Sequence, residues 1–305
     1  MAFAAFGGNA PAATSSSSRK SGKIVLALLL PGLIYLGLFF LTPLFSLIIT
    51  SLESPDASGA IGAYQYGFEI NNYLQVITDY LPQILRSFLY ALLATVFALL
   101  ISYPLAYFIG VRLRSRPMIQ RLLVTLVIAP FFISFLLRTI AWKQILSEGA
   151  PIMQWVHSVG LLGNDQYFIG TPAAVIFGLT YNFIPFMTLP LYTTLERFDI
   201  RLIEAGSDLY ASPAKVFRKI TLPISMPGVI SGTLLTFIPI TGDYVNASRD
   251  FLGSSQTSMI GNMVEADFLQ NLRYPAASAL SVLLMAVILV IVSVYVKRSG
   301  TEDLL

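Results

Sequence analysis

The chain has 305 residues, of which 55% are hydrophobic and 11% are charged, and its formal net charge is +3. Soluble domains carry about 25% charged residues, so this chain has too few to cover a water-exposed surface. Its small net charge gives no basis for nucleic-acid binding. The sequence contains no cysteine and one histidine, His157, which excludes disulfide frameworks, thiolate metal sites and most acid–base constellations. The composition therefore predicts a membrane protein.

The N-terminal stretch 1–22 is rich in Ala, Ser and Gly and predicts a disordered cytoplasmic tail. The apolar run that follows is too long for the core of a signal peptide and has no small-residue cleavage site, so it predicts a spanning helix. We therefore expect a single membrane domain over 23–305, with its core at about 83–296.

A membrane-spanning helix needs about 20 mostly apolar residues. Six segments meet this requirement and predict an all-α membrane protein with six transmembrane helices. The predicted spans are 24–52, 87–111, 122–146, 168–191, 224–247 and 276–296. Membrane helices tolerate internal proline, so we expect kinks in the third to fifth spans. The prolines concerned are Pro130, Pro185, Pro190, Pro227 and Pro239.

The placement of Lys and Arg predicts that both termini are cytoplasmic, because basic residues favour cytoplasmic loops. With this orientation, only five of the 19 basic residues lie in spans or external loops. These five are Arg86, Arg138, Lys143, Arg249 and Arg273. The external loops are then 53–85, 147–167 and 248–275. In the last of these, Glu265 and Asp267 are expected to be solvated.

The internal loop 193–223 is the most informative stretch of the sequence. Glu204 stands among small residues on a segment that predicts a short helix. Pro213 suits the first turn of a second short helix, where its missing N–H is harmless, and Ser212 precedes it as an N-cap. The spacing of apolar and basic residues after Pro213 allows a helix on the membrane surface or a docking element for a cytoplasmic partner.

This loop resembles the EAA signature of type I ABC importer permeases, which reads Glu-Ala-Ala, three residues, Gly, nine residues, Ile-x-Leu-Pro. The matching residues are Glu204, Ala205, Ile220, Leu222 and Pro223. Gly206 replaces the second Ala, and Tyr210 replaces the signature Gly. If that Gly needs a positive φ, Tyr210 alters the turn. We assign all of these residues, together with Asp208, to an ATPase-coupling loop.

The resemblance extends from Ile24 onward and implies the type I ABC importer permease fold in a bacterial inner membrane. In such importers the EAA loop sits in a groove of a cytoplasmic ATPase dimer, whose closure on ATP reshapes the membrane helices. The implied partners are that ATPase dimer, an extracytoplasmic substrate-binding protein and a second homologous permease chain, most often a different one. The sequence contains no Walker-type phosphate loop, so we expect no enzyme activity and no bound cofactor in this chain. ATP and Mg²⁺ are expected to belong to the partner ATPase.

Two stretches, 135–142 and 241–245, resemble the permeases for spermidine and putrescine within that family. Asp243 lies in a predicted span, where an ionisable residue is a functional candidate because its burial is costly. We therefore predict a polyamine substrate whose ammonium group pairs with Asp243. The alternative is that Asp243 lies at the membrane interface or pairs with Arg249.

The remaining candidates for the substrate pathway are aromatic or polar. Trp142, Tyr181 and Tyr244 can hold a cation over a ring, although such residues commonly serve packing or interfacial roles. Asn182 either contacts substrate or bonds across helices. Arg138 is an unfavourable neighbour for a cation and is expected to neutralise an acidic residue or tie helices together.

Three alternatives to a polyamine permease follow from the sequence. The same fold can serve sulfate, ferric iron, thiamine or sugars. An ion-coupled secondary transporter would show inverted repeats, which we do not find, and would leave the EAA loop unexplained. An intramembrane enzyme would need a nucleophile with a base, and one external histidine does not supply this.

Overall fold

The computed structural model describes residues 18–58, 60–163 and 166–298, and these are mostly helical. Contacts divide the chain into two units, Met1–Ile49 and Thr50–Leu305. The predicted tail lies largely outside the described residues, and helix α1 begins at Ser18, within the predicted tail. The first unit contains α1 (Ser18–Leu36), a π-helical segment η1 (Gly37–Leu41) and most of α2 (Thr42–Thr50). Its apolar span has no buried residues, as expected of a helix that faces lipid.

The second unit begins with a two-stranded antiparallel hairpin and a long helix. The hairpin pairs β1 (Ser54–Pro55) with β2 (Tyr64–Gln65). Helix α3 (Asn71–Tyr107) continues as the π-helical segment η2 (Phe108–Arg112). The predicted second span therefore forms, within a helix that starts well before it.

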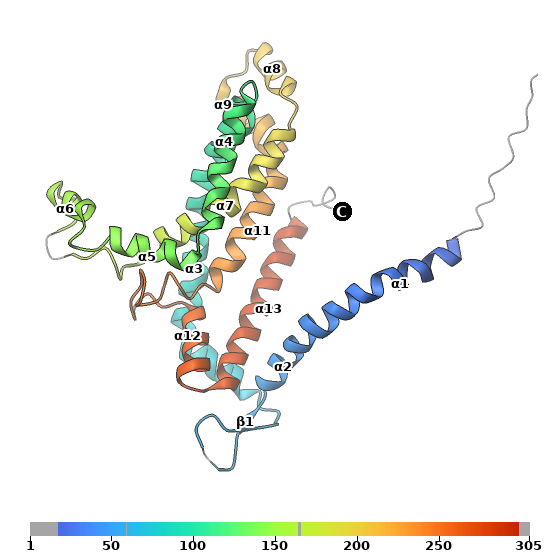
Figure 1. The fold of residues 1–305 in the computed structure, drawn as a ribbon, viewed down its shortest axis with the longest axis vertical. Coiled ribbons are helices and arrows are strands. Elements are labelled where there is room, and N and C mark those ends of the chain that lie inside the picture. The colour runs from blue at the N-terminus through green and yellow to red at the C-terminus, as the bar shows by residue number, and fades with distance from the viewer. Residues whose placement is uncertain (1–17, 59, 164–165, 299–305) are drawn as a thin grey trace, which may run out of the picture. The chain divides into compact units, whose positions relative to one another are not determined.

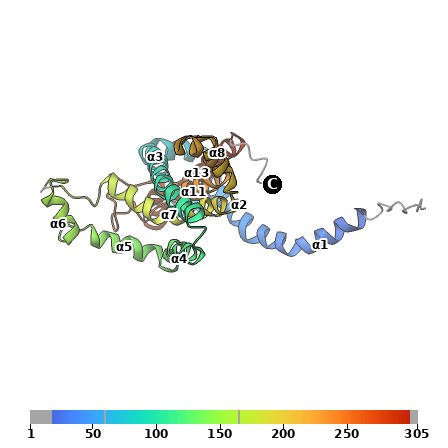
Figure 2. The ribbon, with the colours of Figure 1, turned by 90° about the horizontal axis from the view of Figure 1, so that it is seen from above.

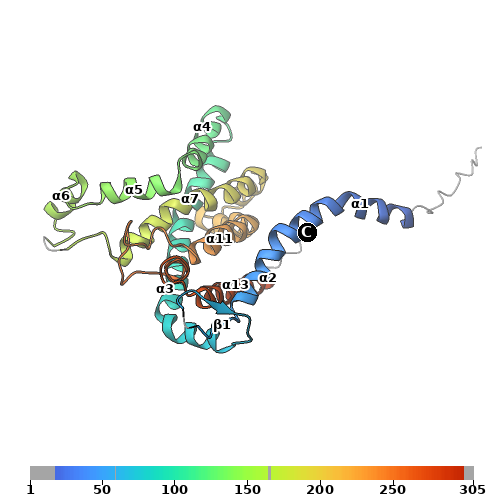
Figure 3. The same ribbon diagram turned by 60° about the horizontal axis from the view of Figure 1, so that its bottom comes forward.

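A bent arm follows α3. It consists of α4 (Pro117–Ile128), the 3₁₀ segment η3 (Ala129–Phe132), α5 (Phe135–Ile145) and α6 (Pro151–Ser158). Helices α4 and α5 run in different directions (Figure 3). The axes on either side of the break after η3 differ by 94°, and Pro130 lies in η3. The expected kink in the third predicted span is therefore confirmed, because the helical hydrogen-bond pattern stops at this proline-containing turn.

The rest of the unit carries the internal loop and the last spans. In chain order the elements are α7 (Pro172–Arg197), α8 (Arg201–Asp208), α9 (Pro213–Val216), η4 (Phe217–Thr221, π-helical), α10 (Leu222–Ile224), α11 (Met226–Thr241), α12 (Ile260–Glu265), η5 (Ala266–Gln270, π-helical) and α13 (Tyr274–Arg298). The fifth predicted span ends earlier in the structure, at Thr241, and a 65° bend lies at Ser225, near its start, where a kink was expected. The described part of the chain thus contains four continuous apolar helices long enough to span a membrane, and up to six spans if each bent pair is one.

Helices α3, α7 and α11 form the centre of the second unit, and α8 and α12 lie toward opposite ends of it (Figures 1 and 2). Small residues allow close contact between the helices. Ala94 and Ala98 of α3 are fully buried, and a Cβ on Gly232 of α11 would lie 2.8 Å from Met187 Sδ of α7. Close packing of this kind holds membrane helices together, because lipid is as apolar as the side chains themselves.

The segment between α12 and α13 closes the other end of the unit around a buried carboxylate. Asp267 is fully buried and accepts hydrogen bonds from Tyr80 Oη (2.8 Å) and Asn271 Nδ2 (2.9 Å). Arg273 Nη1 lies 3.8 Å from its Oδ1. The expectation that Asp267 is solvated is therefore wrong, because Tyr80 of α3 and the residues that follow η5 enclose its carboxylate.

Candidate functional site

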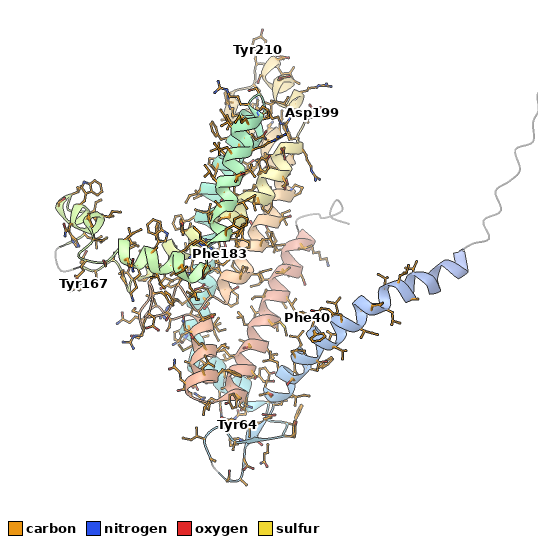
Figure 4. All side chains as sticks on the ribbon, in the orientation of Figure 1. Phe40, Tyr64, Tyr167, Phe183, Asp199 and Tyr210 are labelled. Atoms are coloured by element: carbon orange, nitrogen blue, oxygen red, sulfur yellow. The ribbon has the colours of Figure 1, made fainter. Side chains whose placement is uncertain are left out.

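The predicted coupling loop forms two short helices at one end of the second unit (Figures 1 and 4). Glu204 and Asp208 lie on α8 and are exposed, as is Ala205. Pro213 starts α9 as predicted, and Ser212 has the N-cap position without a side-chain hydrogen bond to the helix. The loop therefore presents its acidic residues at the surface.

Gly206 brings α8 close to the segment that follows α9. A Cβ at this position would lie 2.8 Å from Ile220 Cδ1 and 3.2 Å from Val216 Cγ2. Gly206 is buried, and Ile220 is partly buried. Two neighbouring elements of the loop thus pack as one body because position 206 has no side chain. Leu222 then packs against the buried cluster of α3 and α7, while Pro223 is exposed.

Tyr210 lies at the tip of the loop with a backbone φ of +55°. Its side chain is 100% exposed and points away from the bundle (Figure 4). This is the position where the EAA signature has Gly, and the positive φ explains why Gly suits it. Tyr210 therefore keeps the turn in a left-handed conformation while it exposes a large aromatic ring.

A cavity of about 370 Å³ lies between this loop and the end of α3. Glu204 and Ser207 of α8 line one part of it, and Arg112 of η2 lines another. Glu204 and Arg112 do not form an ion pair, although both line the same space. The loop therefore borders a hollow that carries both signs of charge.

A second site is a buried polar cluster between α5, α7 and the segment after α11. Asn182 of α7 donates hydrogen bonds to Thr139 Oγ1 of α5 (3.2 Å) and to Asn246 Oδ1 (3.1 Å). The backbone N–H and the side-chain amide of Asn246 donate to the Asp243 carboxylate at 2.8 and 3.1 Å. All four residues are buried. Asn182 thus bonds across helices, which was one of its two predicted roles.

The cluster depends on the absence of a side chain at Gly178 of α7. A Cβ there would lie 2.7 Å from Asn246 Oδ1 and 2.4 Å from Leu252 Cδ1. Gly178 therefore allows the segment after α11 to pack against α7 and bring Asn246 to Asn182. Thr139, Gly178 and Asn246 were not among the predicted site residues. The three-residue spacing of Asp243 and Asn246 could have indicated their contact, because an Asp side chain commonly accepts a hydrogen bond from a nearby backbone N–H.

Asp243 lies two residues beyond the end of α11 and is 8% exposed. Burial raises the pKa of its carboxyl from 3.8 to about 6, and the hydrogen bonds from Asn246 oppose this rise. Asp243 has no ion-pair partner among the described residues, so the predicted pairing with Arg249 is absent. Neutral donors alone therefore hold this carboxylate.

Arg138, Trp142 and Tyr181 meet where α5 packs on α7. The Trp142 ring lies 5.1 Å from the Tyr181 ring and 4.7 Å from that of Phe177, edge-on in both cases. Arg138 is 8% exposed and lies over the Phe135 ring, with the Arg138 Nε and Nη1 atoms buried and without hydrogen-bond partners. The predicted role of Arg138 in neutralising an acidic residue is not seen within the described chain.

Tyr244 is the sixth predicted pathway residue and lies apart from these contacts. Its side chain is exposed, and its carbonyl accepts a 2.6 Å hydrogen bond from Asn262 Nδ2. The structure therefore divides the candidates into a polar cluster around Asp243 and Asn182, an aromatic contact around Arg138, and an exposed Tyr244.

A protein-family model described as the inner membrane component of binding-protein-dependent transport systems matches residues 102–299. This chain belongs to that family. The match includes the coupling loop, the polar cluster and the aromatic contact. It identifies the chain as a multi-pass inner-membrane permease component of a transport system.

Curated relatives extend the similarity to almost the whole chain. The spermidine/putrescine transport system permease protein PotB of Haemophilus influenzae is 32% identical over 283 residues, which is 92% of this chain and 95% of the relative. PotB of Escherichia coli K12 is 32% identical over 91% of this chain and 94% of its own length. The inner membrane ABC transporter permease protein YdcU of the same organism is 28% identical over 73% of this chain and 72% of its own.

Solved structures show the same fold at lower identity. A chain of a bacterial ABC transporter that imports the acidic polysaccharide alginate has a TM-score of 0.71 at 18% identity, covering 93% of this chain and 97% of that one. A chain of the MetNI methionine ABC transporter has a TM-score of 0.57 at 18% identity, covering 75% and 96%. The predicted fold, that of ABC importer permeases, is confirmed.

Proposed function

We propose that this permease carries polyamines such as spermidine and putrescine. The observation that carries the proposal is the 32% identity to spermidine/putrescine permeases along 92% of the chain. The charge at Asp243 agrees with a cationic substrate, because this buried carboxylate has no basic partner among the described residues. An opposite charge brought by the substrate would offset the cost of its burial.

The coupling loop is proposed to dock on a cytoplasmic ATPase dimer that binds the ATP and Mg²⁺. Its exposed apolar tip supports this role, since Leu209 and Tyr210 are 81% and 100% exposed and follow directly after the acidic helix α8. Exposed aromatic residues of this kind are common at the centres of protein interfaces. A second homologous permease chain and an extracytoplasmic binding protein complete the proposed complex, with both termini of this chain in the cytoplasm.

The direct test is the ATPase activity of the reconstituted complex with its binding protein. Spermidine, putrescine, sulfate and a sugar are titrated separately. Stimulation by a polyamine, and not by sulfate or the sugar, is the expected result. Stimulation by sulfate or the sugar alone would refute the proposed substrate and leave the family assignment intact.

The role of Asp243 is tested with a charge-neutral variant. Asp243→Asn is expected to lower polyamine uptake at least ten-fold, corresponding to about 1.4 kcal/mol, in a complex that still assembles. Asp250→Asn is the matched control, because Asp250 is exposed in the same segment and its carboxylate makes no ion pair among the described residues. Equal uptake by the two variants would remove Asp243 from the substrate pathway.

The docking role of α8 is tested with a charge reversal. Glu204→Lys is expected to abolish substrate-stimulated ATP hydrolysis, because reversing the charge on the docking surface would loosen the ATPase. Glu148→Lys is the matched control, because Glu148 is exposed and lies outside the coupling loop. It is expected to leave the substrate stimulation of ATP hydrolysis unchanged. Full stimulation in the Glu204 variant would refute the docking assignment.

A further inference from the structure

The break between α10 and α11 lies directly between the coupling loop and the central bundle. The segment Pro213–Ile224 and α11 differ in direction by 65°, and Ser225 stands between them. Pro223 and Pro227 flank Ser225 and have no backbone N–H, so this part of the chain has fewer helical hydrogen bonds than a regular helix. Any movement of α8 and α9 that reaches α11 along the chain must pass through this break.

A side chain of α3 holds the break through a buried hydrogen bond. Tyr103 Oη lies 2.6 Å from Ser225 Oγ, and both residues are buried. Ser225 donates its single hydroxyl proton to Leu222 O at 3.0 Å, so Tyr103 is the donor in the first bond. The hydrogen bonds therefore run from α3 through Ser225 to Leu222, a residue of the EAA signature.

The ring of Tyr103 contacts the loop side of the same break. Its centroid lies 5.4 Å from that of Phe217 in an edge-on arrangement, and Phe217 begins the π-helical segment η4. Tyr103 thus contacts the chain both eight residues before the break and at the break itself. Within the described residues, no other side chain of α3 forms a hydrogen bond to the segment 213–241.

We propose that Tyr103 is a positioning residue for energy coupling, which braces the break at Ser225 so that displacement of α8 and α9 turns α11 as one body. The inference rests on the proposed docking of the coupling loop on an ATPase. Without the brace, the break bends, and loop movement is absorbed before it reaches the bundle. ATP hydrolysis then proceeds with less transport per ATP.

The hydrogen bond is tested by Tyr103→Phe, which removes one oxygen and keeps the ring. Loss of a buried hydrogen bond worth about 1 kcal/mol is expected to speed amide exchange in the peptide 217–232 about five-fold. Tyr90→Phe is the matched control, because Tyr90 is buried on the same helix and its hydroxyl makes no hydrogen bond within the described residues. Exchange at wild-type rate in the Tyr103 variant would overturn the brace.

A double-variant cycle separates a brace acting through Ser225 from general loosening of α3. If Tyr103 acts through Ser225, Tyr103→Phe changes exchange in the wild-type background and changes nothing further in Ser225→Ala. Additive effects of the two substitutions would overturn this assignment.

Coupling itself is measured in proteoliposomes as substrate moved per ATP hydrolysed. Tyr103→Phe is expected to lower this ratio at least three-fold while unstimulated ATP hydrolysis stays within two-fold of wild type, and Tyr90→Phe is expected to change neither. An unchanged ratio would overturn the proposal. If the complex moves no polyamine at all, the proposed substrate is refuted, and the amide-exchange cycle then decides the brace by itself.

Discussion

Replacing Tyr210 by glycine is expected to stabilise the turn between α8 and α9. The left-handed conformation at φ +55° costs a non-glycine residue about 1–2 kcal/mol. Glycine removes this cost but gives the unfolded turn more freedom, which costs about 0.5–1 kcal/mol. The Tyr210 ring is fully exposed, so its loss removes no packing within the chain. The net gain is about 0.5–1 kcal/mol.

Amide exchange over 205–216 is the suitable assay, because the turn holds its own set of backbone hydrogen bonds. Tyr210 N–H donates to Ser207 O at 2.9 Å, and Ala211 N–H donates to Gly206 O at 3.2 Å. A gain of about 0.5–1 kcal/mol slows exchange from the opened turn about two- to five-fold.

Alanine at the same position separates backbone strain from loss of the ring. Tyr210→Ala keeps the Cβ and therefore the strain, so its exchange rate is expected to stay at that of wild type. If Tyr210→Ala slows exchange as much as Tyr210→Gly, the reasoning from φ is refuted. Faster exchange in the glycine variant would show that the ring contributes contacts absent from this conformation.

Three further changes have defined outcomes. Because the pKa of Asp243 is raised on folding, folding takes up a proton between about pH 4 and pH 6. As pH rises through this range, the Asp243 carboxyl lowers the free energy of unfolding by up to about 3 kcal/mol. The Tm of wild type should therefore fall relative to that of Asp243→Asn between pH 4 and pH 7, and a constant difference would contradict this. Gly178→Ala is expected to cost about 1–3 kcal/mol in Tm measurements because its Cβ would overlap Leu252, whereas Gly149→Ala meets nothing within 4 Å and should be neutral. Arg114→Ala removes hydrogen bonds to the last carbonyls of α7 and is expected to destabilise the protein by about 1–2 kcal/mol, which urea unfolding in detergent would detect, with a wild-type midpoint as the contradicting result.

Part of the coupling loop followed from residue types alone. Pro213 predicted the start of α9, because its missing N–H is harmless in a first turn. Because Tyr210 replaces the signature Gly, the sequence raised the possibility of a positive φ at this position. The structure has Tyr210 in the left-handed conformation. The π-helical form of η4 was not predictable, because no local pattern distinguishes it from an α-helix.

The partners of two buried carboxylates, Asp243 and Asp267, could not be predicted from the sequence. Asp243 was identified as costly to bury, but its partner was expected to be Arg249 or a substrate. The structure gives it Asn246, which Gly178 allows to approach α7. Asp267 was expected in water and is fully buried beside Tyr80, 187 residues earlier in the chain.

The sequence by itself determined the apolar spans, the position of the coupling loop and the family resemblance. Lipid demands long apolar helices whatever lies beside them, and a signature depends only on order and spacing along the chain. Tertiary structure alone decided the partners of Asp243 and Asp267 and the hydrogen bond from Tyr103 to Ser225. A hydrogen bond requires donor and acceptor atoms within about 3 Å of each other, and residues distant in sequence reach that distance only after the helices have packed.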